Sequence, residues 1–191
     1  MESVDFSNMR RSMVDSQLRT SGVTSAWVVA AMGAVAREDF VPEALRSTAY
    51  MDRALPLGNG QVLNPPVGTA LLLQAANVAV DEKVLLIGSP DGYCASLLAK
   101  QTTNLIAVES LADLPEAVFS IIIIDGAVGV LPDGLMSVAR EGTRIVTGIV
   151  DGGVTRLAAG IVRDGKVALR PFSDTEIAVL PEFAAAREFV F

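Results

Sequence analysis

The hydrophobic pattern of this chain alternates short apolar runs with polar loops and amphipathic stretches. The clearest example is KVLLIGSPDGYCASLLAK, in which an apolar run, a loop of small and polar residues and a second apolar stretch follow one another. This order predicts a strand over Lys83–Ile87, a loop over Gly88–Gly92 and a helix over 93–100. Strand–loop–helix units of this kind are typical of domains that hold nucleoside cofactors.

Further apolar runs of strand length follow at Leu105–Val108, Phe119–Ile124 and Arg144–Val150. The second run contains four consecutive isoleucines without alternation, which is typical of a strand buried on both faces of a parallel sheet. Pro132 stands where a first helical turn would begin and therefore predicts a helix over 132–139.

The sequence LAAGIVRDGKVALRPF predicts a β-hairpin near the end of the chain. Asp164 and Gly165 suit the positive φ angles of a type I′ turn. Strands that alternate with helices, followed by an antiparallel pair, indicate an α/β protein with a doubly wound parallel sheet and a hairpin at one edge. The length of 191 residues suits one domain over 1–191.

The first part of the chain is predicted to be helical. One helix is expected over 8–19, and a second after Thr24, where apolar residues repeat along one stripe. The stretch 54–68 contains three prolines and three glycines, so we expect no regular structure there. Its length indicates either a functional loop or a rigid surface loop. A further helix is expected over 69–77.

Hydrophobic residues make up 51% of the chain and the mean hydropathy is +0.45. Such values favour a large apolar core. The alternative is an additional buried interface, which would make the protein a homo-oligomer. No apolar run approaches the roughly 18 residues of a membrane span, and no apolar stretch follows the first charges as in a signal peptide. We therefore expect no membrane partner.

The net charge of −7 argues against a nucleic-acid partner, because no basic stripe is present to bind phosphates. The absence of histidine excludes Ser-His-Asp and Cys-His catalysis and histidine-based metal sites, and no tight acidic cluster suggests another metal. The single cysteine, Cys94, excludes an internal disulfide and fits a cytoplasmic location.

In doubly wound sheets the ligand lies at the carboxyl ends of the strands. The loop GSPDG follows the first strand, and its glycines would let a ligand approach the backbone closely. Glu109 follows the next strand, seventeen positions after Gly92, where a carboxylate can accept hydrogen bonds from both ribose hydroxyls. These features together predict a cofactor site.

The segments 13–42, 49–66 and 83–99 resemble the signature sequences of protein-L-isoaspartate O-methyltransferases, and FSIIIIDGAVGVLPDGLM and EGTRIVTG are similar to the family's later elements. The resemblance implies a Rossmann-like methyltransferase sheet, S-adenosylmethionine as cofactor, and methyl transfer to isoaspartyl carboxylates of damaged proteins. It divides the domain into N-terminal helices with an acceptor loop (1–68) and the core (69–191). The positions it assigns are Gly88, Ser89, Asp91, Gly92, Glu109 and Asp125 for the cofactor, and Asn64 in the acceptor loop.

Several positions depart from the family pattern. Leu86 replaces an acidic residue, Pro90 replaces a loop glycine, and Asn64 replaces a serine. Asp91 is interpreted as an N-cap of the following helix, and whether or not it caps that helix, its carboxylate is expected near the position of the cofactor's own carboxylate. The nine residues 110–118 are too few for the family's next helix and strand, so the strand before Glu109 is expected to be a sheet edge.

Three functions follow from these observations. The chain is an isoaspartyl methyltransferase, with activity that the departures impair or abolish. Alternatively it is a non-catalytic scaffold or regulator with a methyltransferase fold, or it binds a different small ligand in the altered cleft.

Overall fold

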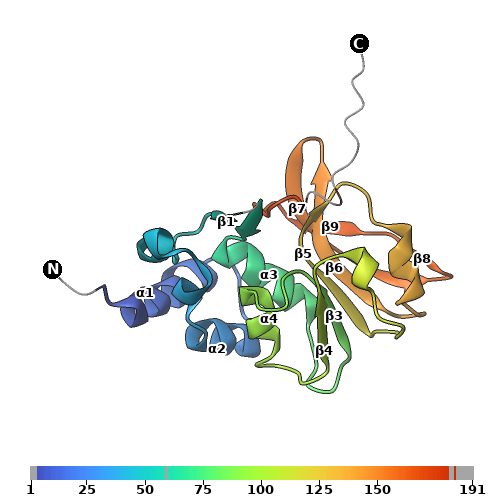
Figure 1. The fold of residues 1–191 in the computed structure, drawn as a ribbon, viewed down its shortest axis with the longest axis horizontal. Coiled ribbons are helices and arrows are strands. Elements are labelled where there is room, and N and C mark those ends of the chain that lie inside the picture. Colours follow the sequence, from blue (N-terminus) through green and yellow to red (C-terminus); the bar gives the residue numbers. More distant parts are fainter. Residues whose placement is uncertain (1–3, 59, 181–182, 184–191) are drawn as a thin grey trace, which may run out of the picture.

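The computed structural model describes residues 4–58, 60–180 and 183, in which N-terminal helices pack against one side of a twisted sheet (Figure 1). Helix α1 spans Phe6–Met13 and continues as a π-helical turn over Val14–Leu18, close to the predicted helix 8–19. It begins earlier because the Asp5 carboxylate accepts a hydrogen bond from the Asn8 amide at 3.0 Å. Helix α2 spans Ala26–Ala34, as the apolar stripe predicted.

The stretch 54–68 is regular, which corrects the prediction from its composition. Strands β1 (Leu55–Gly58) and β2 (Gln61–Leu63) form an antiparallel pair, and α3 (Pro66–Ala76) begins before residue 69. Gly58 and Gly60 have φ angles of +96° and +79°, which permit the tight reversal between the strands. Pro66 is accommodated in the first turn of α3, where no amide donor is needed.

The parallel part of the main sheet consists of β3 (Val84–Ile87), β4 (Leu105–Val108), β5 (Ile121–Val128) and β6 (Arg144–Asp151). Helix α4 (Tyr93–Leu98) connects β3 to β4. Among the described residues the main sheet has seven strands and begins with the order β4-β3-β5-β6. The α/β class with a mostly parallel sheet is therefore confirmed, and β4 is the edge strand that the short segment 110–118 predicted.

The antiparallel part follows β6 and contains β7 (Val154–Arg163), β8 (Lys166–Val167) and β9 (Arg170–Ser173). Asp164 and Gly165 have φ angles of 50° and 70° and form the predicted turn between β7 and β8. A second hairpin joins β6 to β7 through Gly152 and Gly153, and this one was not predicted.

The two faces of the sheet are covered differently. One core lies between the sheet and the helices α1 to α4, and includes Leu86 and Ile123. In the described part of the chain, the other core lies under two 3₁₀ turns, Leu111–Asp113 and Asp133–Ser137. The helix predicted over 132–139 is thus only a 3₁₀ turn that starts after Pro132. None of the described helices is long and apolar enough to cross a membrane.

Candidate functional site

The register of the parallel strands brings three predicted residues to one edge of the sheet. Ile87 of β3 pairs with Val108 of β4 on one side and with Ile124 of β5 on the other. The next residue of each strand is therefore at the carboxyl edge: Gly88 in the centre, flanked by Glu109 and Asp125. This is the edge at which open α/β sheets bind ligands.

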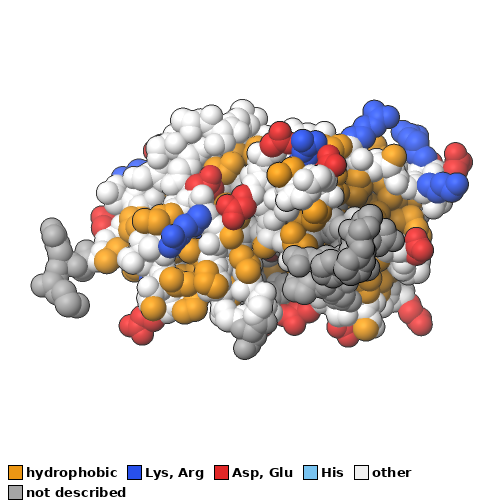
Figure 2. Space-filling view, turned by 90° about the horizontal axis from the view of Figure 1, so that it is seen from above, with side chains coloured by type: hydrophobic (Ala, Val, Ile, Leu, Met, Phe, Trp, Pro, Cys, Tyr) orange, Lys and Arg blue, Asp and Glu red, His pale blue; other side chains and the backbone are white. Residues whose placement is uncertain are grey.

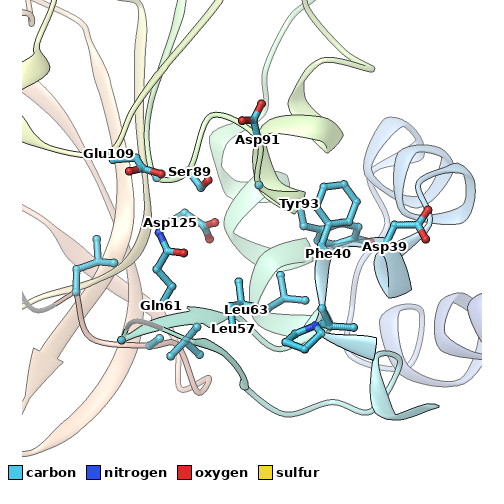
Figure 3. Close-up of a pocket in the computed structure, with 18 of the residues that line it drawn as sticks. Asp39, Phe40, Leu57, Gln61, Leu63, Ser89, Asp91, Tyr93, Glu109 and Asp125 are labelled. Carbon is cyan, nitrogen blue, oxygen red and sulfur yellow. The ribbon is translucent and has the colours of Figure 1, made fainter. Parts of the chain in front are cut away.

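A cavity of about 490 Å³ lies at this edge. All six residues predicted to bind a cofactor line it, whereas Asn64 does not. In Figure 3, Ser89, Glu109 and Asp125 lie on one side of the cavity, and the rings of Phe40 and Tyr93 lie on the other. The remaining lining residues come from the segment 39–42, from β1 and β2, and from the C-terminal segment 178–180.

The loop between β3 and α4 requires glycine at two positions, because other atoms of the protein lie too close for a side chain. A Cβ atom on Gly88 would lie 3.0 Å from Cβ of Asp125, and one on Gly92 would lie 3.0 Å from the carbonyl oxygen of Ser89. The amide of Gly92 donates to the same carbonyl at 3.0 Å, which closes a tight turn. Gly92 itself is the N-cap of α4, so the N-cap interpretation of Asp91 is wrong. The Asp91 carboxylate is exposed and points away from Asp125 (Figure 3).

Asn64 is buried behind the cavity, with 2% of its surface exposed. Its Nδ2 donates to Oδ1 of Asp125 at 2.9 Å and to the Asp125 carbonyl at 3.1 Å. Its Oδ1 accepts a hydrogen bond from the amide of Ala178 at 2.7 Å. The side chain therefore joins three segments that are distant in sequence, and its polar atoms are already bonded within the protein.

Asp125 reaches the cavity because β5 is irregular beside β6. The register shifts between Ile123 and Ala127, so β5 contains extra residues around Asp125. Burial raises the pKa of Asp125, while the hydrogen bond from Asn64 and the charge of Arg37 oppose that increase.

Arg37 is a fully buried cation that the sequence analysis did not identify. Its Nε donates to the Ala49 carbonyl at 2.7 Å and its Nη2 to the Asn64 carbonyl at 2.6 Å. The guanidinium lies over the Tyr93 ring, 5.1 Å from its centre. Burial lowers the pKa of Arg37 to about 10. The only signal in the sequence was a charged residue three positions after the end of α2 at Ala34.

The C-terminal segment 176–180 forms a wall of the cavity that was also not predicted. Ala127 donates to the Ala178 carbonyl at 2.7 Å and accepts from the amide of Leu180 at 3.0 Å. Gly126 and Gly148 provide the space, since a Cβ on either would lie 2.5 Å from a side-chain atom of this segment. No hydrophobic periodicity marks these contacts in the sequence.

The lining of the cavity is acidic. Four acidic residues, Asp39, Asp91, Glu109 and Asp125, are among the residues that line it, and in the described part of the chain no lysine or arginine does. A cavity of one sign of charge concentrates ligands of the opposite sign. The arrangement therefore favours a ligand with positive charge and hydrogen-bond donors.

Comparison with known proteins identifies the family. Residues 8–118 match the family model described as protein-L-isoaspartate(D-aspartate) O-methyltransferase. The chain belongs to this family. The matched region contains the N-terminal helices, the β1–β2 pair and the strands β3 and β4, and it ends before β5.

Curated relatives bear the same name. The protein-L-isoaspartate O-methyltransferase 2 of Marinobacter nauticus is 40% identical over 110 residues, 58% of this chain and 50% of that protein. The protein-L-isoaspartate O-methyltransferase of Methanoculleus marisnigri is 29% identical over 199 residues, 90% of each. The matched segment thus spans about half the length of relatives such as the first.

Two solved structures share the fold. One protein-L-isoaspartate O-methyltransferase aligns with a TM-score of 0.75 over 92% of this chain and 67% of its own, at 18% identity. A putative family member from Plasmodium falciparum, crystallised with S-adenosyl-L-homocysteine, aligns with a TM-score of 0.73 over 94% of this chain and 100% of its own, at 15% identity. Both likenesses concern the arrangement of the elements.

Proposed function

We propose that the cavity binds S-adenosylmethionine and that methyl transfer to isoaspartyl carboxylates is impaired in this protein. The observation that supports binding most strongly is the placement of Gly88 between Glu109 and Asp125 at the carboxyl edge of the sheet. The cavity volume of about 490 Å³ lies within the range of small-ligand sites.

Each group of the protein has a role that suits this ligand. Glu109 would accept hydrogen bonds from the ribose hydroxyls, while Gly88, Ser89 and Gly92 would bring the backbone close to the ligand. The acidic lining, including Glu109 and Asp125, would stabilise the positive charges of the sulfonium and the amino group. When bound, the cofactor supplies an electrophilic methyl group with its own leaving group.

The acceptor side supports impairment rather than full activity. A methyltransferase must hold the acceptor carboxylate in line with the methyl group. Asn64, at the acceptor-loop position, is bonded to Asp125 and Ala178 instead of facing the cavity. Among the described residues, no cation lines the cavity to hold the carboxylate. We assign Asn64 as a positioning residue for Asp125.

Two measurements test the proposal separately. Isothermal titration calorimetry with S-adenosylmethionine should detect saturable binding below millimolar concentration. Methyl transfer to an isoaspartyl peptide should be slower than for a full-length relative by about a hundredfold, the usual cost of one missing polar contact in the transition state. No binding at millimolar cofactor would contradict the first part, and a rate equal to that of the relative would contradict the second.

A non-catalytic scaffold or regulator is the second candidate. The hydrogen bonds of Asn64 to Asp125 and Ala178 also favour it, because they leave its side chain unable to hold an acceptor. Cofactor binding without any methyl transfer would support this candidate.

The edge strand β4, whose Ile106 is 36% exposed, supports self-association as a further property. Light scattering coupled to size-exclusion chromatography should then report a homo-oligomer. The buried free thiol of Cys94 supports a cytoplasmic location.

A further inference from the structure

A second cavity, of about 800 Å³, lies beside the C-terminal end of α3, on the face of the sheet that α3 covers. Its residues come from α3, β6, β7, β8 and β9 and from the segment between the last two. None of them lines the cavity that contains Gly88 and Glu109. The two cavities are therefore separate.

The floor of this second cavity is apolar because of the strand register. Val146 of β6 pairs with Ala159 of β7, and the next pair on the same face includes Ile161. Ala75 of α3 adjoins them. At Ile161 this face is not fully covered, because the side chain is 45% exposed. The floor is thus partly open to solvent.

The rim of the cavity is basic. Arg144 of β6, Arg163 of β7, Lys166 of β8 and Arg170 of β9 all line it, and no described Asp or Glu does. Arg163, Lys166 and Arg170 are exposed and form no ion pair with any described residue. Figure 2 shows lysine and arginine side chains gathered at the end of the molecule where Figure 1 places β8.

Arg144 differs from the other three rim cations because it forms an ion pair. Its Nη2 pairs with Glu82 at 2.8 Å, whereas its Nε is buried and has no hydrogen-bond partner among the described residues. The guanidinium is held at the C-terminal end of α3, because Nη2 also donates to the backbone carbonyls of Ala76 and Asn77 at 3.2 Å. The chain has a net charge of −7, so four cations around one apolar floor give this surface a charge opposite to that of the whole protein.

We propose that this second cavity binds an amphiphilic anion: a carboxylate or phosphate group on an apolar body. The apolar body would cover Val146, Ala159 and Ile161, and the anionic group would contact the basic rim. The concave shape and limited volume favour one small ligand over a polyanion, since a phosphate backbone requires an extended basic stripe.

Decanoate is a suitable probe, titrated below its aggregation concentration and followed by calorimetry and by NMR shifts of Ile161. Saturable binding of one molecule per chain is expected. The double variant Arg163→Gln/Arg170→Gln should bind at least about tenfold more weakly, since it loses two charge-assisted contacts. The matched double variant Arg11→Gln/Lys100→Gln removes two exposed cations elsewhere and should bind as the original protein does.

A second variant keeps all four rim cations and adds an opposing charge on the floor. Ile161→Glu places a carboxylate at an exposed floor position and should weaken decanoate binding by more than about tenfold. Absence of saturable decanoate binding would overturn the proposal. So would equal binding of decyltrimethylammonium, equal losses in the two double variants, or binding to phosphatidylglycerol vesicles without binding to monomeric decanoate.

Discussion

Asn64 connects the acceptor loop directly to β5, because its Nδ2 donates to Oδ1 of Asp125 at 2.9 Å. Oδ1 of the same side chain accepts from the amide of Ala178, and the backbone carbonyl of Asn64 accepts from Nη2 of Arg37. A buried network of this kind is stable only while each polar group keeps its partner. Asn64 therefore stabilises the site by joining β5 to the C-terminal segment.

Replacing Asn64 by leucine should lower the free energy of unfolding by about 2–4 kcal/mol. The variant leaves the Asp125 carboxyl group and the Ala178 amide buried without their partner, which is among the costly classes of substitution. Urea denaturation measures the effect. The control Gln61→Leu changes an exposed residue and should stay within about 0.5 kcal/mol of the original protein. Similar values for the two variants would contradict a structural role for Asn64.

Replacing Asp125 by asparagine should change how stability depends on pH. Burial raises the pKa of Asp125 above its ordinary value of 3.8, so the folded protein favours the protonated form. The stability associated with this proton is complete below 3.8 and is lost as the pH rises through the folded-state pKa. The difference in unfolding free energy, Asp125→Asn minus original, should thus increase from pH 4 to pH 7.

Urea denaturation at several pH values provides the measurement. An exposed control, Asp133→Asn, should follow the original protein throughout the range. A difference that stays constant or falls with pH would show that the charged form of Asp125 is not disfavoured in the folded protein.

The carboxyl edge of the sheet that forms the cavity could be predicted from the sequence, because the hydrophobic pattern of each strand shows where that strand ends. The strands before Gly88 and Glu109 are continuous apolar runs, and parallel strands end at a common edge. Asp125 was predicted as a site residue only because of the family resemblance. The register shift in β5 that brings it into the cavity depends on its neighbour β6, so no local pattern records it.

Composition misled the interpretation of 54–68, since prolines and glycines can also sit at turns and at helix starts. Gly58 and Gly60 form the turn of a hairpin, and Pro66 opens α3. The contacts of Arg37 with Asn64, and of Asn64 with Ala178, join residues that are 27 and 114 positions apart. Such pairs depend on how the folded segments meet, which periodicity does not describe.

The C-terminal wall of the cavity should be sensitive to the size of residue 148. A Cβ on Gly148 would lie 2.9 Å from Cα of Ala127 and 2.5 Å from Cγ2 of Ile177, so Gly148→Ala should cost about 1–3 kcal/mol of unfolding free energy. Gly134→Ala is the matched control, because no atom lies within 4 Å of its added Cβ. Equal stability of the two variants would mean that segment 176–180 yields without cost.

Glu109 provides the sharpest test of the cofactor assignment, because its proposed role concerns binding and not stability. Glu109→Gln keeps the shape of the side chain but loses the charge that strengthens a hydrogen bond from a ribose hydroxyl. Calorimetry should show S-adenosylmethionine affinity reduced by about tenfold, equivalent to about 1.4 kcal/mol. Glu116→Gln alters an exposed carboxylate in the same connecting segment and should leave the affinity unchanged. If Glu109→Gln binds as tightly as Glu116→Gln, the ribose contact lies elsewhere in the cavity.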